Sequence, residues 1–80
     1  MPKVFEENGR KYFFYSNEGD PREPMHIHFR AGQGEAKIWL RPEVKIAAAY
    51  GFNSREQLEL LNTARRRRDE IERAWHACFS

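Results

Sequence analysis

Apolar and polar residues alternate on both sides of Gly32 and Gln33, within residues 25–40. A two-residue turn with glycine first is typical of type II′ hairpins, and it fixes which residues of the two strands face each other. One face then pairs Phe29 with Ala36, Ile27 with Ile38 and Met25 with Leu40. The other face pairs Arg30 with Glu35, His28 with Lys37 and His26 with Trp39. An apolar face opposite a polar one predicts an antiparallel hairpin buried on one side.

Further strands are predicted on either side of this hairpin. Residues 3–5 and the aromatic stretch 11–16 form strands joined by a turn at Asn8-Gly9, which is a strong hairpin signal. Two prolines and a glycine predict an irregular loop over residues 17–24. The β-branched start of residues 43–50 favours a last strand, although three successive alanines also suit a helical turn.

An amphipathic helix is predicted at the end of the chain. Ser54 and Gln57 have the spacing of a capping box, which starts the helix. Apolar residues then recur at helical intervals, at Leu58, Leu61, Ala64, Ile71, Trp75 and Cys78. Four arginines at 65–68 interrupt the stripe, but their methylene stems can lie along an apolar surface. We expect one long helix over residues 54–79, packed on the apolar face of a sheet of four or five antiparallel strands. The fold class is therefore α+β, as a single domain over residues 1–80.

Composition agrees with one small globular domain, since 40% of the 80 residues are hydrophobic and 32% are charged. No apolar run approaches the roughly 18 residues of a membrane span, and no signal-peptide pattern opens the sequence. We therefore expect a cytoplasmic protein with no membrane contact. Cys78 is the only cysteine, which excludes an internal disulfide and predicts a small buried residue near the helix end. The net charge of +2 permits nucleic-acid contact without requiring it.

Two histidines, His26 and His28, project from the same face of the predicted hairpin. Zinc enzymes use such pairs, but a zinc site needs three or four ligands. His76 lies on the helix, across the core from the pair, and the remaining nearby candidates are the carboxylates of Asp20, Glu23 and Glu35. Because the ligand set is incomplete, we predict neither a metal nor another cofactor.

The same face allows three other interpretations. Histidine could serve as the acid or base of metal-free RNA cleavage, with Arg30 or Lys37 holding a phosphate. Binding is the second interpretation, because a basic face with an indole suits phosphates and stacking, or a protein interface. The residues of this binding face are His26, His28, Arg30, Lys37, Trp39 and Arg41. In the third interpretation the histidines simply lie on a solvated face, and a loop partly covers Trp39.

A second basic patch is formed by Arg65, Arg66, Arg67 and Arg68. On a helix, i,i+4 spacing pairs Arg65 with Asp69, Arg66 with Glu70 and Arg68 with Glu72. Only Arg67 lacks an acid four residues further on. A solvated, largely neutralised helix face is therefore favoured over a phosphate-binding track.

Four motifs, "FFYSNE", "PMHIHFRAGQGEAKIWL", "YGFNSREQLE" and "AWHACF", occur in this order. With them the chain resembles a family of short bacterial proteins known only as a domain of unknown function, over nearly its whole length. The family pattern falls on Pro24, His26, His28, Glu35, Lys37, Trp39, Gly51, Trp75 and His76. No established catalytic residues come with it.

Genes of such proteins are similar to those predicted beside a second small protein in toxin–antitoxin pairs. The resemblance therefore implies a heteromeric partner and control of translation or transcription. Our hypothesis is a non-enzymatic binding component of such a pair, which engages the neighbouring gene's protein, or RNA or DNA, through the His26/His28/Trp39 face. The alternative is a small ribonuclease-like toxin that uses His26 or His28, with or without a bound metal. The free sheet edges would also allow a homodimer.

Overall fold

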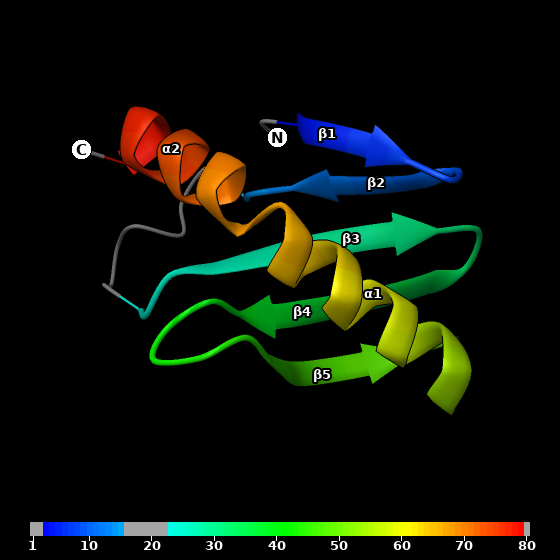
Figure 1. Cartoon of the computed structure of the whole chain (residues 1–80). Helices are drawn as coiled ribbons and strands as arrows, with labels where there is room; N and C mark the ends of the chain where they lie inside the picture. The colour runs from blue at the N-terminus through cyan, green and yellow to red at the C-terminus, as the bar shows by residue number, and fades with distance from the viewer. Residues whose placement is uncertain (1–2, 16–22, 80) are drawn as a thin grey trace.

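The computed structural model describes residues 3–15 and 23–79 of the chain, and all five of its strands form one antiparallel sheet. The strands follow each other in chain order: β1 (Lys3–Glu7), β2 (Arg10–Phe13), β3 (His26–Ala31), β4 (Gly34–Trp39) and β5 (Lys45–Tyr50). Two helices, α1 (Ser54–Arg66) and α2 (Arg68–Phe79), lie on one face of the sheet (Figure 1). The predicted α+β fold is confirmed, and the ambiguous stretch 43–50 contains a strand.

The β3–β4 hairpin pairs in the register that the sequence predicts. All three apolar pairs and all three polar pairs face each other, and the amide of Leu40 donates to the carbonyl of Met25 over 2.8 Å. Ile27, Phe29 and Ile38 are completely buried. The Asn8-Gly9 turn between β1 and β2 is also confirmed, with positive φ at both residues as a type I′ turn requires.

The core lies between the apolar face of the sheet and the two helices. Leu60 and Ala64 of α1 and Ile71 of α2 are completely buried against it. Phe5, Tyr12 and Phe29 form a row of rings on neighbouring strands, with centroids 4.3 and 5.0 Å apart. This row packs three large side chains beneath the helices, which lets a chain of 80 residues build a continuous core.

The helical segment is two helices, so the prediction of one long helix over residues 54–79 is wrong. The break lies at Arg67, where φ is −107° and ψ is 20°. Its guanidinium carbon lies 3.6 Å from the ring centroid of Phe5, and its nitrogens pair with Glu7 of β1 at 3.1 Å and with Glu70 at 2.8 Å. The contacts with Phe5 and Glu7 fix Arg67 against the first hairpin, and a helical pattern cannot anticipate them.

The start of α1 also differs from the prediction. The N-cap is Asn53 rather than Ser54, and its side chain accepts from the amide of Glu56 over 2.8 Å. Glu56 completes the capping box by accepting from the Asn53 amide over 2.9 Å. Ser54 with Gln57 and Asn53 with Glu56 both have the spacing of a capping box. The structure uses the second pair, which contains a carboxylate.

Cys78 is exposed, so its predicted burial is wrong. It does lie near the end of the last helix, as expected. The side of α2 that packs on the core carries Ile71, Ala74, Trp75 and Phe79, and Cys78 points away from it.

Gly34 and Gly51 bring the start of β4 and the end of β5 into close contact. A Cβ atom on Gly51, whose φ is +78°, would lie 2.6 Å from the Cα of Gly34. A residue larger than glycine at position 51 would strain the left-handed backbone and overlap with Gly34.

We expect Gly51→Ala to lower the free energy of unfolding by about 3 kcal/mol, because backbone strain and steric overlap add. Gly32→Ala is the matched control, since Gly32 has φ of +56° and open space around its Cβ position. Strain alone should cost this control about 1 kcal/mol. Urea denaturation measures both values, and equal losses would contradict the close approach.

Candidate functional site

Most of the predicted site residues lie on the sheet face opposite α1 and α2, which we call the helix-free face. Its residues form two rows that cross all five strands. The first row is Glu6, Lys11, Arg30, Glu35 and Tyr50, and the second is Lys3, Phe13, His28, Lys37 and Ala48. His26, Trp39 and Lys45 continue the face beyond them. The register therefore brings together His26, His28, Arg30, Lys37 and Trp39, as the sequence predicts.

The two histidines are buried, which excludes the interpretation that they lie on a solvated face. His26 is completely buried, and His28 is 8% exposed. Their rings are 5.2 Å apart, and the Nδ1 atom of His26 lies 2.9 Å from the carbonyl oxygen of Pro24. The pair is thus enclosed within the protein rather than presented on its surface.

Aromatic rings surround the histidines, and we call the whole group the histidine cluster: Phe13, Tyr15, His26, His28, Trp39 and Trp75. His28 contacts Phe13 and Tyr15, with centroids 5.8 and 4.6 Å away. His26 contacts Trp39 at 5.5 Å and Trp75 at 5.3 Å. Sequence reasoning did not place Phe13, Tyr15 or Trp75 in this site, although the family pattern includes Trp75 and the pairing of residue 13 with residue 28 would have revealed Phe13.

Helix α2 reaches the cluster through Trp75. Trp75 also contacts Phe14 and Phe79, whose ring centroids lie 5.3 and 4.5 Å away, so the indole joins the cluster to the core. His76 is exposed. Helix α2 therefore packs against the histidine cluster as well as against the apolar face of the sheet.

The cations of the predicted binding face are paired with acids. Lys37 binds Glu23 at 2.7 Å, Arg30 binds Glu35 at 3.0 Å, and Arg41 binds Glu72 of α2 at 2.6 Å. Hydrogen bonding to Lys37 lowers the pKa of the exposed Glu23 carboxyl. These cations form ion pairs within the fold, so less of their charge is available to a ligand. The face is therefore less basic than its lysines and arginines alone suggest.

Glu35 sits at the centre of a hydrogen-bonded set on this face. Its two carboxylate oxygens accept from Tyr15, whose hydroxyl is 3.0 Å away, and from Arg30. Burial, followed by the hydrogen bond and negative charge of Glu35, raises the pKa of Tyr15 above 10.0. Glu35 in turn raises the pKa of Arg30. A hollow of about 160 Å³ beside this set is lined by His28, Glu35, Ala36, Lys37, Ala48 and Tyr50.

Trp39 is half-buried and borders a second hollow on the face. The ammonium of Lys37 lies 4.4 Å from the ring centroid of Trp39, a cation–π contact. The hollow, which we call the Trp39 pocket, has a volume of about 310 Å³ and is lined by Pro24, Trp39, Arg41, Pro42, Glu43 and Lys45. The indole is thus in contact with Lys37 and also lines a hollow of this size.

No metal site is formed by the described residues, 3–15 and 23–79, because no group of three or more His, Cys, Asp or Glu side chains converges there. Asp20, one of the predicted additional ligands, lies outside that part of the chain. Nor does any helix in the same part have the length and apolar character to span a membrane.

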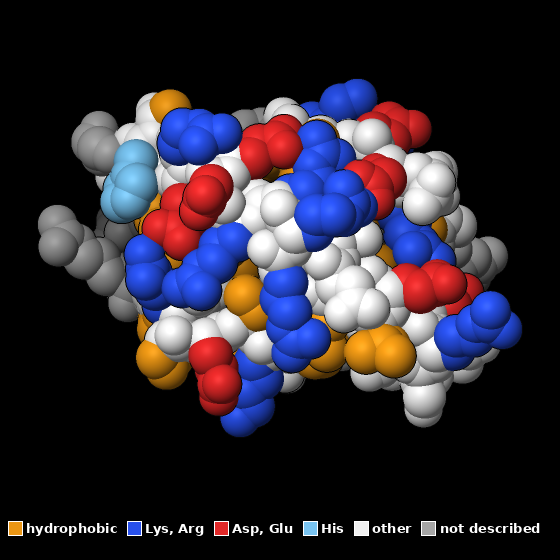
Figure 2. Space-filling view, viewed as in Figure 1, with side chains coloured by type: hydrophobic (Ala, Val, Ile, Leu, Met, Phe, Trp, Pro, Cys, Tyr) orange, Lys and Arg blue, Asp and Glu red, His pale blue; other side chains and the backbone are white. Residues whose placement is uncertain are grey.

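The arginine run, residues 65–68, is largely neutralised by acids. Arg68 pairs with Glu72 at 3.0 Å as predicted, but Arg66 pairs with Glu7 rather than Glu70. Arg67, which has no acid four residues further on, pairs instead with Glu7 and with Glu70. Figure 2 shows basic and acidic side chains interspersed over the helix side of the molecule rather than gathered in one basic patch.

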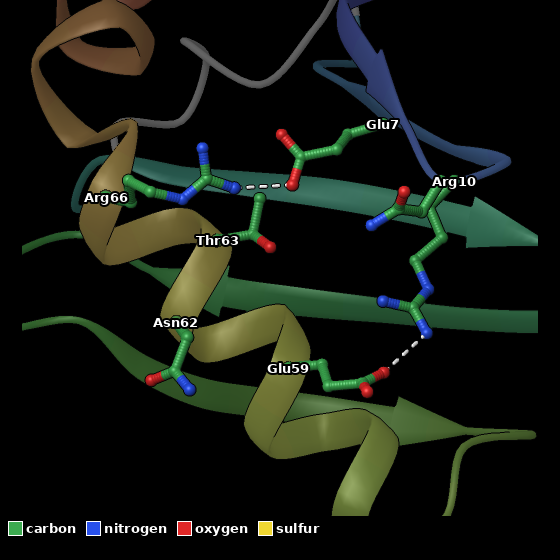
Figure 3. A pocket seen from close by; sticks show the side chains of 7 residues that line it. Glu7, Arg10, Glu59, Asn62, Thr63 and Arg66 are labelled. Carbon is green, nitrogen blue, oxygen red and sulfur yellow. Dashed lines mark hydrogen bonds and ion pairs between the residues drawn. The ribbon is translucent and has the colours of Figure 1, made fainter.

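A polar cleft of about 420 Å³ separates α1 from the β1–β2 hairpin. Figure 3 shows ion pairs along it, from Arg66 to Glu7 and from Arg10 to Glu59, the latter at 2.9 Å. Asn62 and Thr63 complete its helix wall. Each arginine drawn there is paired with a carboxylate of the opposite element, so ion pairs across the cleft join the β1–β2 hairpin to α1.

These features define an α+β protein with two helices on one face of a five-stranded sheet and a histidine-centred cluster on the other. The chain belongs to a family described as a domain of unknown function (DUF4160), whose profile matches residues 9–76. That match spans β2 to α2, including every histidine of the chain. No curated protein and no solved structure matches the chain.

The ionisation of Tyr15 tests the central hydrogen-bonded set. The raised pKa of Tyr15 means that the folded state favours the neutral phenol. The neutral phenol therefore stabilises the folded protein below pH 10, and this contribution to the free energy of unfolding is lost as pH rises through the folded-state pKa. We expect Glu35→Gln to lower the pKa of Tyr15, since the carboxylate charge that opposes ionisation is removed. Phenolate absorbance during alkaline titration measures it. Glu43→Gln, which removes an exposed carboxylate elsewhere, should leave the curve unchanged, and identical curves for all three proteins would refute the arrangement.

Proposed function

We propose that the protein is a non-enzymatic binding component of a bacterial toxin–antitoxin-like pair that acts in the cytoplasm. Its partner is a small protein encoded by a neighbouring gene. Contact is made at the end of the helix-free face that carries Trp39, and the resemblance to the family supports the paired arrangement.

The observation that carries this proposal is the Trp39 pocket. Tryptophan is prominent among residues that dominate binding energy at protein interfaces, especially where polar groups surround a partly buried ring. Trp39 has such a setting, because Lys37 covers part of its ring and prolines at 24 and 42 line the adjoining space. The charged rim formed by Arg41, Glu43 and Lys45 suits a partner that places an apolar side chain in the pocket and polar groups around it.

Enclosure of the histidines favours binding over catalysis. A general acid or base must reach the proton that it transfers within hydrogen-bond distance. His26 is fully buried with Nδ1 at the carbonyl of Pro24. His28 is only 8% exposed, packs against the rings of Phe13 and Tyr15, and lines the hollow beside Glu35. Both histidines are better placed to hold the shape of the face than to transfer protons to a substrate.

We expect Trp39→Ala to weaken binding of the neighbouring gene's protein by about 30-fold, the loss typical of a 2 kcal/mol interface residue. Isothermal titration calorimetry with the two purified proteins measures this. Tyr50→Ala is the control, because it removes a large ring that is 70% exposed at the far end of the face. Equal affinity of wild type and Trp39→Ala, with both folded by circular dichroism, contradicts the proposal.

A further inference from the structure

A cationic hollow lies at the end of the helix-free face away from Trp39. It has a volume of about 240 Å³, and we call it the lysine pocket; its lining residues are Lys3, Lys11, Phe13 and Arg30. We propose that the lysine pocket binds the backbone phosphates of a single-stranded nucleic acid, one of whose bases stacks on Tyr50. Its residues lie apart from the Trp39 pocket, so this inference does not rest on the proposed protein partner.

In the lysine pocket, Lys3 and Lys11 keep most of their charge for a ligand, whereas Arg30 is paired with Glu35. Lys11 is exposed and has no ion pair among the described residues. Lys3 meets Glu6 only at 3.4 Å, with its side chain 56% exposed. Arg30, held by Glu35, keeps its guanidinium at a fixed position 5.4 Å from the ring centroid of Phe13. Three cations thus surround one aromatic floor, an arrangement that suits a polyanion whose groups are also flat and partly apolar.

Tyr50 supplies the stacking surface. It is the most exposed large hydrophobic residue described, at 70%, and it lies in the same cross-strand row as Lys11, Arg30 and Glu35. Three inter-strand steps separate β2 from β5, which places Lys11 and Tyr50 about 14 Å apart. A ligand that reaches both residues must be longer than a single phosphate, as an oligonucleotide is. Its bases must be unpaired, since only an unpaired base presents a free ring face for stacking.

Glu35 lies between the cations and Tyr50, and its charge determines where the phosphates and the base of the nucleic acid lie on the face. Its charge is offset by Arg30 and by the hydroxyl of Tyr15, but it still disfavours a phosphate directly above it. Phosphates therefore lie over β2 and β3, and the base reaches toward β5. The arginine run is a poorer site by comparison, because acids of β1 and α2 already hold three of its four guanidinium groups.

Fluorescence anisotropy with labelled oligouridine and oligothymidine of about 12 nucleotides tests this inference. We expect binding that weakens as salt is raised, with a smaller salt dependence for Lys11→Glu. Lys11→Glu and Tyr50→Ala should each weaken binding about tenfold. The two oligonucleotides distinguish RNA from DNA as the ligand, and either supports the site.

Arg65→Glu is the matched control for the charge reversal, because Arg65 is an exposed arginine of α1 on the helix side. It should leave binding unchanged. Three results overturn the inference: absence of binding by the folded wild type at low salt, a loss with Arg65→Glu equal to that with Lys11→Glu, or equally strong competition by polyglutamate. The last would identify the lysine pocket as a surface for an acidic protein.

Discussion

Pairing of β3 with β4 decides which side chains of this protein meet the core and which meet the helix-free face. A shift of one residue would reverse the faces, moving Ile27 and Phe29 out of the core and the two histidines into it. Three apolar pairs oppose such a shift, and the neighbouring strands inherit the same division through their own registers. The rows of the helix-free face exist because this one hairpin cannot slip.

A second interaction positions the end of the chain. Arg67 binds Glu7 of β1 and lies over the ring of Phe5, and the helix bends at this residue. Beyond the bend, α2 reaches the end of the sheet (Figure 1). There Trp75 contacts both Phe14 and His26. The histidine cluster is therefore linked to the first hairpin through the helix, and loss of the Arg67 contacts would loosen one wall of the cluster.

Much of the fold follows from local sequence patterns. The hairpin register could be predicted because alternation and a glycine turn are properties of neighbouring residues. Burial of His26 could not, since the ring that covers it from the helix belongs to Trp75, 49 positions further along the chain. The same holds for the helix break, because Glu7 is 60 residues from Arg67. Composition also overstated the basic character of the face, as acids in other elements pair with Arg41 and Lys37.

The histidines are thus part of an enclosed aromatic cluster, and the two surfaces that we propose for recognition, the Trp39 pocket and the lysine pocket, lie at the rims of the face. Modification of the folded protein with diethyl pyrocarbonate, followed by mass spectrometry, tests this division most directly. Exposed His76 should react readily, whereas His26 should react only after denaturation. Modification of His26 in the folded protein at the rate of His76 would show that the pair is presented to solvent, and it would contradict the account.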